Sequence, residues 1–229
     1  MEKKETAMEK RVPVMEWTAP IRVHHWLMAL SILMLIATGW YIADPFTVSS
    51  GETVGKFLMG DMRYYHILFG VILTFLFIWR MYMGFFERFH AKWENFLAVA
   101  DWKNLIKQIK FYLLVSNERP DHVYLYGPLQ AMSYAGLFVM IFLILITGLI
   151  LTGAGYDHGF LGAVAWVLTP LENLMGGLAF VRYVHHILTW LFVLFIIVHI
   201  YMAFWYDIVF KEGTVSSMIN GVVFKAKEH

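Results

Sequence analysis

Four long apolar runs dominate this chain of 229 residues and leave few folds open to it. A hydrocarbon layer about 30 Å thick takes about 20 apolar residues to cross, and the runs at 22–43, 64–86, 128–152 and 182–206 are long enough. Because 59% of its residues are hydrophobic, the chain has more apolar surface than a soluble domain of this size could bury. The sequence predicts an all-α, integral-membrane four-helix bundle that forms a single domain over residues 1–229.

The basic residues predict how the four spans are oriented. Four crossings return the C-terminus to the side of the N-terminus. Of the 18 lysines and arginines, Lys56, Arg63 and Arg182 fall on the side of the 44–63 and 153–181 loops, and the other 15 fall on the side of the termini. Basic loops are retained in the cytoplasm. We therefore expect both termini to be cytoplasmic and these two loops to lie outside.

Composition also excludes several classes of function. The chain has no cysteine, which excludes disulfides, cysteine-ligated iron–sulfur clusters and haem attached covalently through a C-x-x-C-H motif. A metal would have to be bound by histidine or carboxylate. The net charge is only +1, and the basic residues are spread along the chain, which together argue against a nucleic-acid partner.

Two segments between the spans are apolar but do not qualify as spans. Residues 93–113 carry apolar side chains at roughly helical spacing with lysines between them, which indicates a segment along the inner membrane surface. Residues 160–174 are too short to cross and are interrupted by Pro170, so an interfacial or partner-facing segment is expected.

Histidines inside the membrane spans are the main functional candidates, because polar groups at that depth are costly and usually functional. The fourth span contains His185 and His199, which are 14 residues apart. Fourteen helical residues turn through about 1400°, close to four full turns, and rise about 21 Å. The two side chains therefore share one helix face at opposite membrane depths, whereas His186 points elsewhere.

Depth then predicts which histidines form pairs. The first span runs outward with His25 at its inner end, and the second runs inward with His66 at its outer end. Only histidines at matching depth can reach opposite faces of one iron. The expected axial ligands are His66 with His185 for an outer haem and His25 with His199 for an inner haem. Two histidine ligands leave no open position on the iron, which suits electron transfer.

Each of three expected ligands has an arginine three residues before it. Arg22, Arg63 and Arg182 precede His25, His66 and His185 at this spacing, and residues i and i+3 are neighbours on a helix. We expect these arginines to bind haem propionates, since the guanidinium group suits carboxylate partners.

Glycines also follow threonines in two of the spans. The pairs are Thr38-Gly39 and Thr147-Gly148. Such glycines could let a flat ring approach the backbone, or they could serve ordinary helix packing. The sequence leaves both readings open.

These motifs resemble the cytochrome b subunit of membrane-bound nickel–iron hydrogenases, a relative of the formate dehydrogenase gamma subunit. The first motif reads Arg22-x-x-His25-Trp26-Leu27 and continues to Thr38-Gly39. The second, more specific motif is longer. It comprises Arg182, Tyr183, Val184, His185, His186, Ile187, Trp190, Phe195 and His199. The resemblance covers nearly the full chain.

The resemblance implies a multi-pass protein of the bacterial cytoplasmic (inner) membrane with two non-covalent b-type haems. It also implies hydrogenase small and large subunits docked on the periplasmic face, and menaquinone or another quinone as electron acceptor. The chain would then be a subunit of a hydrogen:quinone oxidoreductase that does not itself activate hydrogen. His122, next to the inner start of the third span, is the expected quinone-site residue.

Other functions remain open on the sequence. A formate dehydrogenase or another respiratory oxidoreductase could be the partner. A proton-coupled transporter or a passive membrane anchor would carry no haem. A transporter would commonly show inverted repeats with broken helices, and the sequence shows no convincing pair of these.

Overall fold

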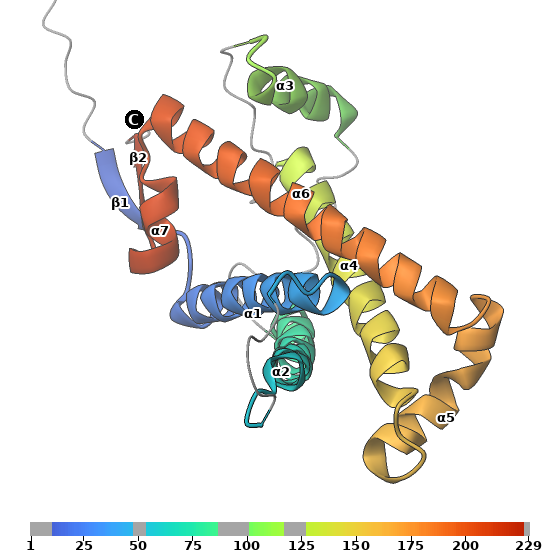
Figure 1. The fold of residues 1–229 in the computed structure, drawn as a ribbon. Helices are drawn as coiled ribbons and strands as arrows, with labels where there is room; N and C mark the ends of the chain where they lie inside the picture. The colour runs from blue at the N-terminus through green and yellow to red at the C-terminus, as the bar shows by residue number, and fades with distance from the viewer. Residues whose placement is uncertain (1–10, 48–53, 87–100, 117–126, 227–229) are drawn as a thin grey trace, which may run out of the picture.

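The computed structural model describes residues 11–47, 54–86, 101–116 and 127–226. The described chain contains two strands and seven helices (Figure 1). Their bounds are β1 Arg11–Met15, α1 Ala19–Ala43, α2 Leu58–Phe86, α3 Trp102–Tyr112, α4 Pro128–Gly153, α5 Gly159–Leu174, α6 Leu178–Phe210, α7 Thr214–Asn220 and β2 Val222–Ala226.

The four predicted spans are confirmed as helices long and apolar enough to cross a membrane. They are α1, α2, α4 and α6, with 25, 29, 26 and 33 residues. Each begins at or before its predicted start. Pro20 lies in the first turn of α1 and Pro128 in that of α4, where the missing N–H costs nothing. At about 1.5 Å per residue, α6 is longer than the hydrocarbon layer is thick.

The spans pack most closely as two helix pairs, α1 with α2 and α4 with α6, and α2 also contacts α4. A small core joins the pairs, with Phe77, Ile141 and Phe192 buried at its centre. Many apolar side chains on the outer faces of the spans are exposed, among them Phe75, Phe138 and Leu194. Such faces are what a lipid environment requires.

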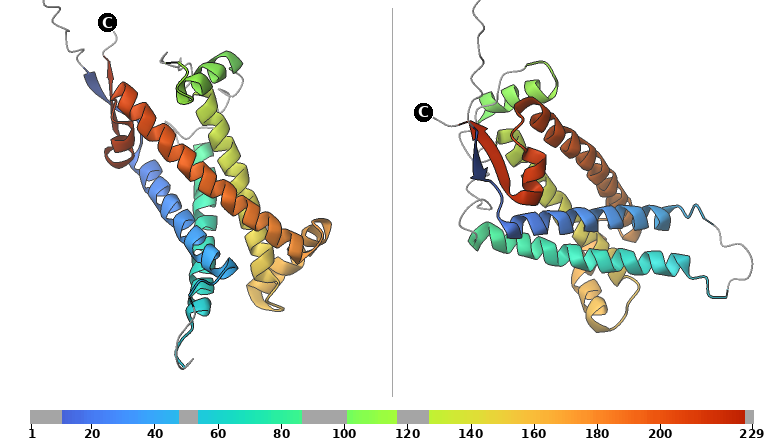
Figure 2. Two further views of the ribbon diagram at one scale, coloured as in Figure 1. Left: turned by 45° about the horizontal axis from the view of Figure 1, so that its top comes forward. Right: turned by 90° about the vertical axis from the view of Figure 1, so that its left-hand side faces the viewer.

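The two ends of the bundle are built differently (Figure 2). One end, here the sheet end, carries β1, β2, α7 and α3, and the opposite end, here the α5 end, carries α5, the end of α1 and the start of α2. Both described ends of the chain thus lie at the sheet end, as four crossings require. That this end faces the cytoplasm stays a prediction.

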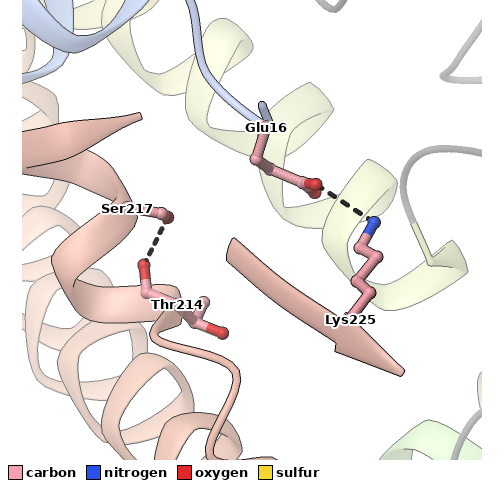
Figure 3. A network of polar contacts seen from close by, with 4 residues as sticks. All are labelled: Glu16, Thr214, Ser217 and Lys225. Carbon is pink, nitrogen blue, oxygen red and sulfur yellow. Dashed lines mark hydrogen bonds and ion pairs between the residues drawn. The ribbon is translucent and has the colours of Figure 1, made fainter. Parts of the chain in front are cut away.

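The all-α prediction is wrong in one respect, because the chain ends form a small sheet. β1 pairs antiparallel with β2, from Arg11 opposite Ala226 to Met15 opposite Val222. After β1, Glu16 forms an ion pair with Lys225 of β2 at 3.1 Å (Figure 3). The sheet therefore ties the chain's two described ends together beside the start of α1.

Helix α7 is held against the start of α1 by hydrogen bonds to its last carbonyls. The Trp26 Nε1–H donates to the Met218 carbonyl at 2.8 Å, and the Arg22 Nη1 donates to the Ile219 carbonyl. Within α7 the Ser217 hydroxyl donates to the Thr214 carbonyl at 2.6 Å (Figure 3). These contacts fix the end of α1 that carries His25.

The turn from α7 into β2 depends on a glycine. Gly221 has a φ of +87°, in the left-handed region that favours glycine. A Cβ atom there would lie 2.8 Å from the Trp17 carbonyl oxygen. The Gly221 carbonyl oxygen accepts hydrogen bonds from the backbone N–H groups of Glu16 and Trp17.

Both shorter apolar segments form helices outside the spans where the structure describes them, and residues 93–100 of the first lie outside the described residues. In α3, the Gln108 side chain accepts a hydrogen bond from the Leu129 N–H at 2.9 Å, which docks α3 against the start of α4. Burial raises the pKa of the Tyr112 hydroxyl at the end of α3 above its ordinary value. Helix α5 continues through Pro170 and has no buried residue, with Phe160 and Trp166 strongly exposed.

Candidate functional site

The structure brings together two pairs of histidines, one near each end of the bundle. At the α5 end, the rings of His66 on α2 and His185 on α6 have centres 6.3 Å apart and planes inclined at 66°. At the sheet end, the rings of His25 on α1 and His199 on α6 have centres 6.2 Å apart and planes inclined at 49°. These are the pairings expected from sequence depth. We refer to them as the α5-end pair and the sheet-end pair.

The spacing within each pair fits one iron between the two rings. Bonds from a metal to an imidazole nitrogen are about 2 Å long, and the ring centre lies about 1 Å behind that nitrogen, so two axial imidazoles have centres about 6 Å apart. The described residues contain no group of three or more His, Cys, Asp or Glu side chains that could hold a metal ion without a prosthetic group.

The α5-end pair rests on the two threonine–glycine pairs. The Thr38 hydroxyl on α1 lies 2.9 Å from His66 Nδ1, and the Thr147 hydroxyl on α4 lies 2.8 Å from His185 Nδ1. A Cβ atom added at Gly39 would lie 3.0 Å from His66 Cε1, and one added at Gly148 would lie 3.4 Å from His185 Cε1. The histidine rings themselves therefore occupy the space that the glycines leave.

The sheet-end pair has apolar surroundings. Trp26 packs edge-on against His25 with ring centres 5.2 Å apart, and Phe195 stacks on His199 with ring centres 5.7 Å apart and planes inclined at 6°. His25 Nδ1 is buried without a hydrogen-bond partner among the described residues. His199 is exposed although it lies within a span. A polar ring at that depth needs a covering group, because lipid would leave its nitrogens unpaired.

The remaining described histidines do not join either pair. His24 is buried between α1 and α2, where its Nε2 bonds to the Leu76 carbonyl at 2.9 Å and its ring meets Trp79 edge-on. His186 is exposed on α6, next to His185. His122, the expected quinone-site residue, lies outside the described residues.

The three expected propionate arginines lie one helical turn before histidines of the pairs. Arg63 and Arg182 are exposed at the α5 end, free to meet a carboxylate. Arg22 lies at the sheet end, where its Nη1 donates to α7 and its Nε is buried without a hydrogen-bond partner among the described residues. A further donor is thus available beside His25.

Comparison with known proteins agrees with this geometry. A family profile described as "Prokaryotic cytochrome b561" matches residues 16–221, which include all four paired histidines. The chain belongs to the prokaryotic cytochrome b561 family. It is therefore a b-type cytochrome, which binds haem b, and a multi-pass protein of the bacterial inner membrane.

Relatives of this cytochrome confirm the family resemblance read from its motifs. It is 31% identical over 226 residues to the "Probable Ni/Fe-hydrogenase B-type cytochrome subunit" of Rhodobacter capsulatus, covering 94% of this chain and 83% of that protein. The protein of that name from Rhizobium leguminosarum bv. viciae is 32% identical, and the match covers 98% of this chain and 94% of that protein. For the "Probable Ni/Fe-hydrogenase 1 B-type cytochrome subunit" of Escherichia coli (strain K12), identity is 28%, with 89% and 87% covered.

The contacts of Thr38 and Thr147 with the paired histidines are the part of this candidate site that sequence reasoning missed. Each Thr-Gly pair is visible in the sequence, yet each lies on a different helix from the histidine it touches. Thr38 on α1 reaches His66 on α2, and Thr147 on α4 reaches His185 on α6. The signal was the repeated dipeptide in two spans that supply no ligand at that depth.

Proposed function

We propose that this cytochrome carries two b haems and passes electrons through them from a nickel–iron hydrogenase on the periplasmic side to a quinone. The observation that carries the proposal is the presence of two histidine pairs, each with ring centres just over 6 Å apart, at opposite ends of α6. The names of the relatives support the hydrogenase partner. The basic residues at the sheet end support a cytoplasmic position for that end.

The paired residues would hold the two haems as follows. His66 and His185 would bind the iron near the periplasmic face, with Arg63 and Arg182 available to its propionates. His25 and His199 would bind the iron near the cytoplasmic face, with Arg22 beside it. A bound haem supplies one-electron chemistry, and two axial histidines on each iron exclude oxygen as a ligand.

The hydrogenase small and large subunits would dock at the α5 end. Helix α5 has no buried residue and presents Phe160, Trp166, Val167 and Leu174 as strongly exposed apolar side chains. Exposed apolar patches of this kind commonly mark interaction sites. The α5-end pair would therefore be the entry point for electrons.

The test is the haem content and the subunit composition of the complex extracted in mild detergent. We expect two b haems per cytochrome chain, both low-spin in the ferric state, and co-purification of hydrogenase subunits. A single haem per chain, or a spectrum with no b-type haem, would end the two-haem proposal. Recovery of a molybdenum enzyme in place of a nickel–iron enzyme would replace the hydrogenase as the partner.

Quinone reduction is proposed for the cytoplasmic side, with His122 as the site residue. Replacing His122 by alanine should lower hydrogen-dependent quinone reduction while leaving both haems and hydrogen-dependent dye reduction intact, because the dye takes electrons before the quinone site. The measurement compares the two rates in the same membranes. Equal rates in the variant and the parent would remove His122 from the quinone site.

A further inference from the structure

We propose that Thr38 and Thr147 are positioning residues for the haem of the α5-end pair, because they fix the tautomer and the ring orientation of His66 and His185. The proposal rests on the proposed function in assuming that these histidines bind iron. It goes further by assigning a task to two residues on the helices that supply no ligand to that iron.

The hydrogen bonds around Thr38 decide which atom donates to which. Its hydroxyl oxygen lies 2.7 Å from the Met34 carbonyl oxygen and 2.9 Å from His66 Nδ1. A carbonyl oxygen can only accept, so a 2.7 Å contact between two oxygens requires the hydroxyl proton to lie between them. The Thr38 oxygen is then left to accept from His66, and Nδ1 must carry the proton.

Thr147 repeats this arrangement on the other helix pair. Its hydroxyl donates to the Leu143 carbonyl at 2.9 Å, and its oxygen lies 2.8 Å from His185 Nδ1. His185 therefore also carries its proton on Nδ1. In both rings the lone pair is left on Nε2, which is the form that a metal requires.

Ring orientation is fixed by the same dipeptides. The hydroxyl contacts one ring nitrogen, and the neighbouring glycine leaves room for the ring edge. A Cβ atom added there would lie 3.0 Å from the His66 ring at Gly39 and 3.4 Å from the His185 ring at Gly148. Each ring is thus held at two points by a helix other than its own. The two rings held in this way have planes inclined at 66°.

A threonine whose hydroxyl only bonded to a carbonyl of its own helix would not contact a histidine on another helix. Threonines in membrane helices commonly bond to the carbonyl four residues earlier, and Thr74 does so with Gly70 at 2.9 Å. Thr38 and Thr147 make that bond as well and then use the remaining lone pair for a histidine. Thr74 therefore provides a matched control on a neighbouring span.

Among the described residues, no threonine forms a hydrogen bond with either histidine of the sheet-end pair. His25 Nδ1 has no hydrogen-bond partner among the described residues, and His199 stacks on Phe195. A hydrogen bond from Nδ1–H makes the imidazole a stronger electron donor, which favours ferric iron. We therefore expect threonine variants to act on one haem and to leave the other as an internal reference.

The test replaces Thr38 or Thr147 by valine, which keeps the shape and removes the hydroxyl, in the whole detergent-extracted complex. We expect the affinity of the α5-end haem to fall by about 10- to 100-fold, the range seen when such partners of a metal ligand are removed. In molecules that keep the haem, its midpoint potential should rise, and its low-spin ferric EPR signal should shift because the angle between the ring planes is no longer fixed.

Three further variants separate positioning from folding. Thr38→Ser and Thr147→Ser keep the hydroxyl and should restore the parent's potential and EPR signal. Thr74→Val should leave both haems unchanged. If the valine variants keep both haems with unaltered potentials and EPR signals, the positioning role is refuted. If the parent complex itself has no haem at the α5-end pair, the proposed function fails first.

Discussion

Alanine at His66 and alanine at His185 are expected to remove the same haem and to leave the other in place. The two rings lie on different helices but have centres 6.3 Å apart, the spacing of two ligands on one iron. Removing either proposed ligand would leave a single axial bond, and we expect that haem to be lost during purification. Alanine at His25 or at His199 should remove the second haem, because that pair is equally close at 6.2 Å.

The measurement is redox titration and EPR of each purified variant, read against the parent with both signals. The four variants should fall into two groups of two. His186→Ala is the matched control, because His186 is adjacent to His185 in the sequence but lies outside both pairs. Loss of different haems from the His66 and His185 variants would contradict the pairing, even with both haems present in the parent.

This pairing could be predicted because a straight helix fixes the relative face and depth of residues that lie many turns apart on one membrane span. His185 and His199 lie on one rigid helix, so their spacing sets both the face and the depth of each ring. The depth of His25 and of His66 follows from the direction in which each span crosses. Few arrangements of four crossing helices satisfy these depths, and in the structure the rings expected to pair have centres 6.3 Å and 6.2 Å apart.

The sheet at the chain ends could not be predicted in the same way. Arg11 and Ala226 are opposite each other across the ladder but lie at opposite ends of the sequence. Each strand has five residues, too few for alternation of apolar and polar side chains to identify it. The pairing depends on the spans having first brought both ends to one side.

The contacts of the threonines could be predicted only in part. The Thr-Gly dipeptide is conspicuous in each span, but its meaning depends on which helix packs beside it. Sequence reasoning considered a flat ring or helix packing, and the structure shows an imidazole edge against each glycine. To predict side-chain contacts between helices, one must know which helices pack together, and the residue pattern within one helix does not reveal this.

Replacing Gly39 by alanine is expected to lower the occupancy of the α5-end haem more than replacing Gly148 by alanine. The new Cβ at Gly39 would lie 3.0 Å from His66 Cε1, closer than real Cβ contacts normally come, whereas the one at Gly148 would lie 3.4 Å from His185 Cε1. Overpacking of this kind typically costs about 1–3 kcal/mol. The His66 ring must move to relieve this contact, and it would then lose the orientation that we propose Thr38 gives it.

Haem occupancy measured at rising detergent concentration should rank the variants, with Gly39→Ala losing the haem first and Gly148→Ala next. Gly70→Ala and Gly136→Ala are the controls, because a Cβ at either position meets nothing within 4 Å. Alanine favours helix over glycine by roughly 0.5–1 kcal/mol, so none of these changes weakens its own helix. A selective loss at Gly39 would therefore come from the histidine ring, and equal behaviour of all four variants would contradict the close contact seen there.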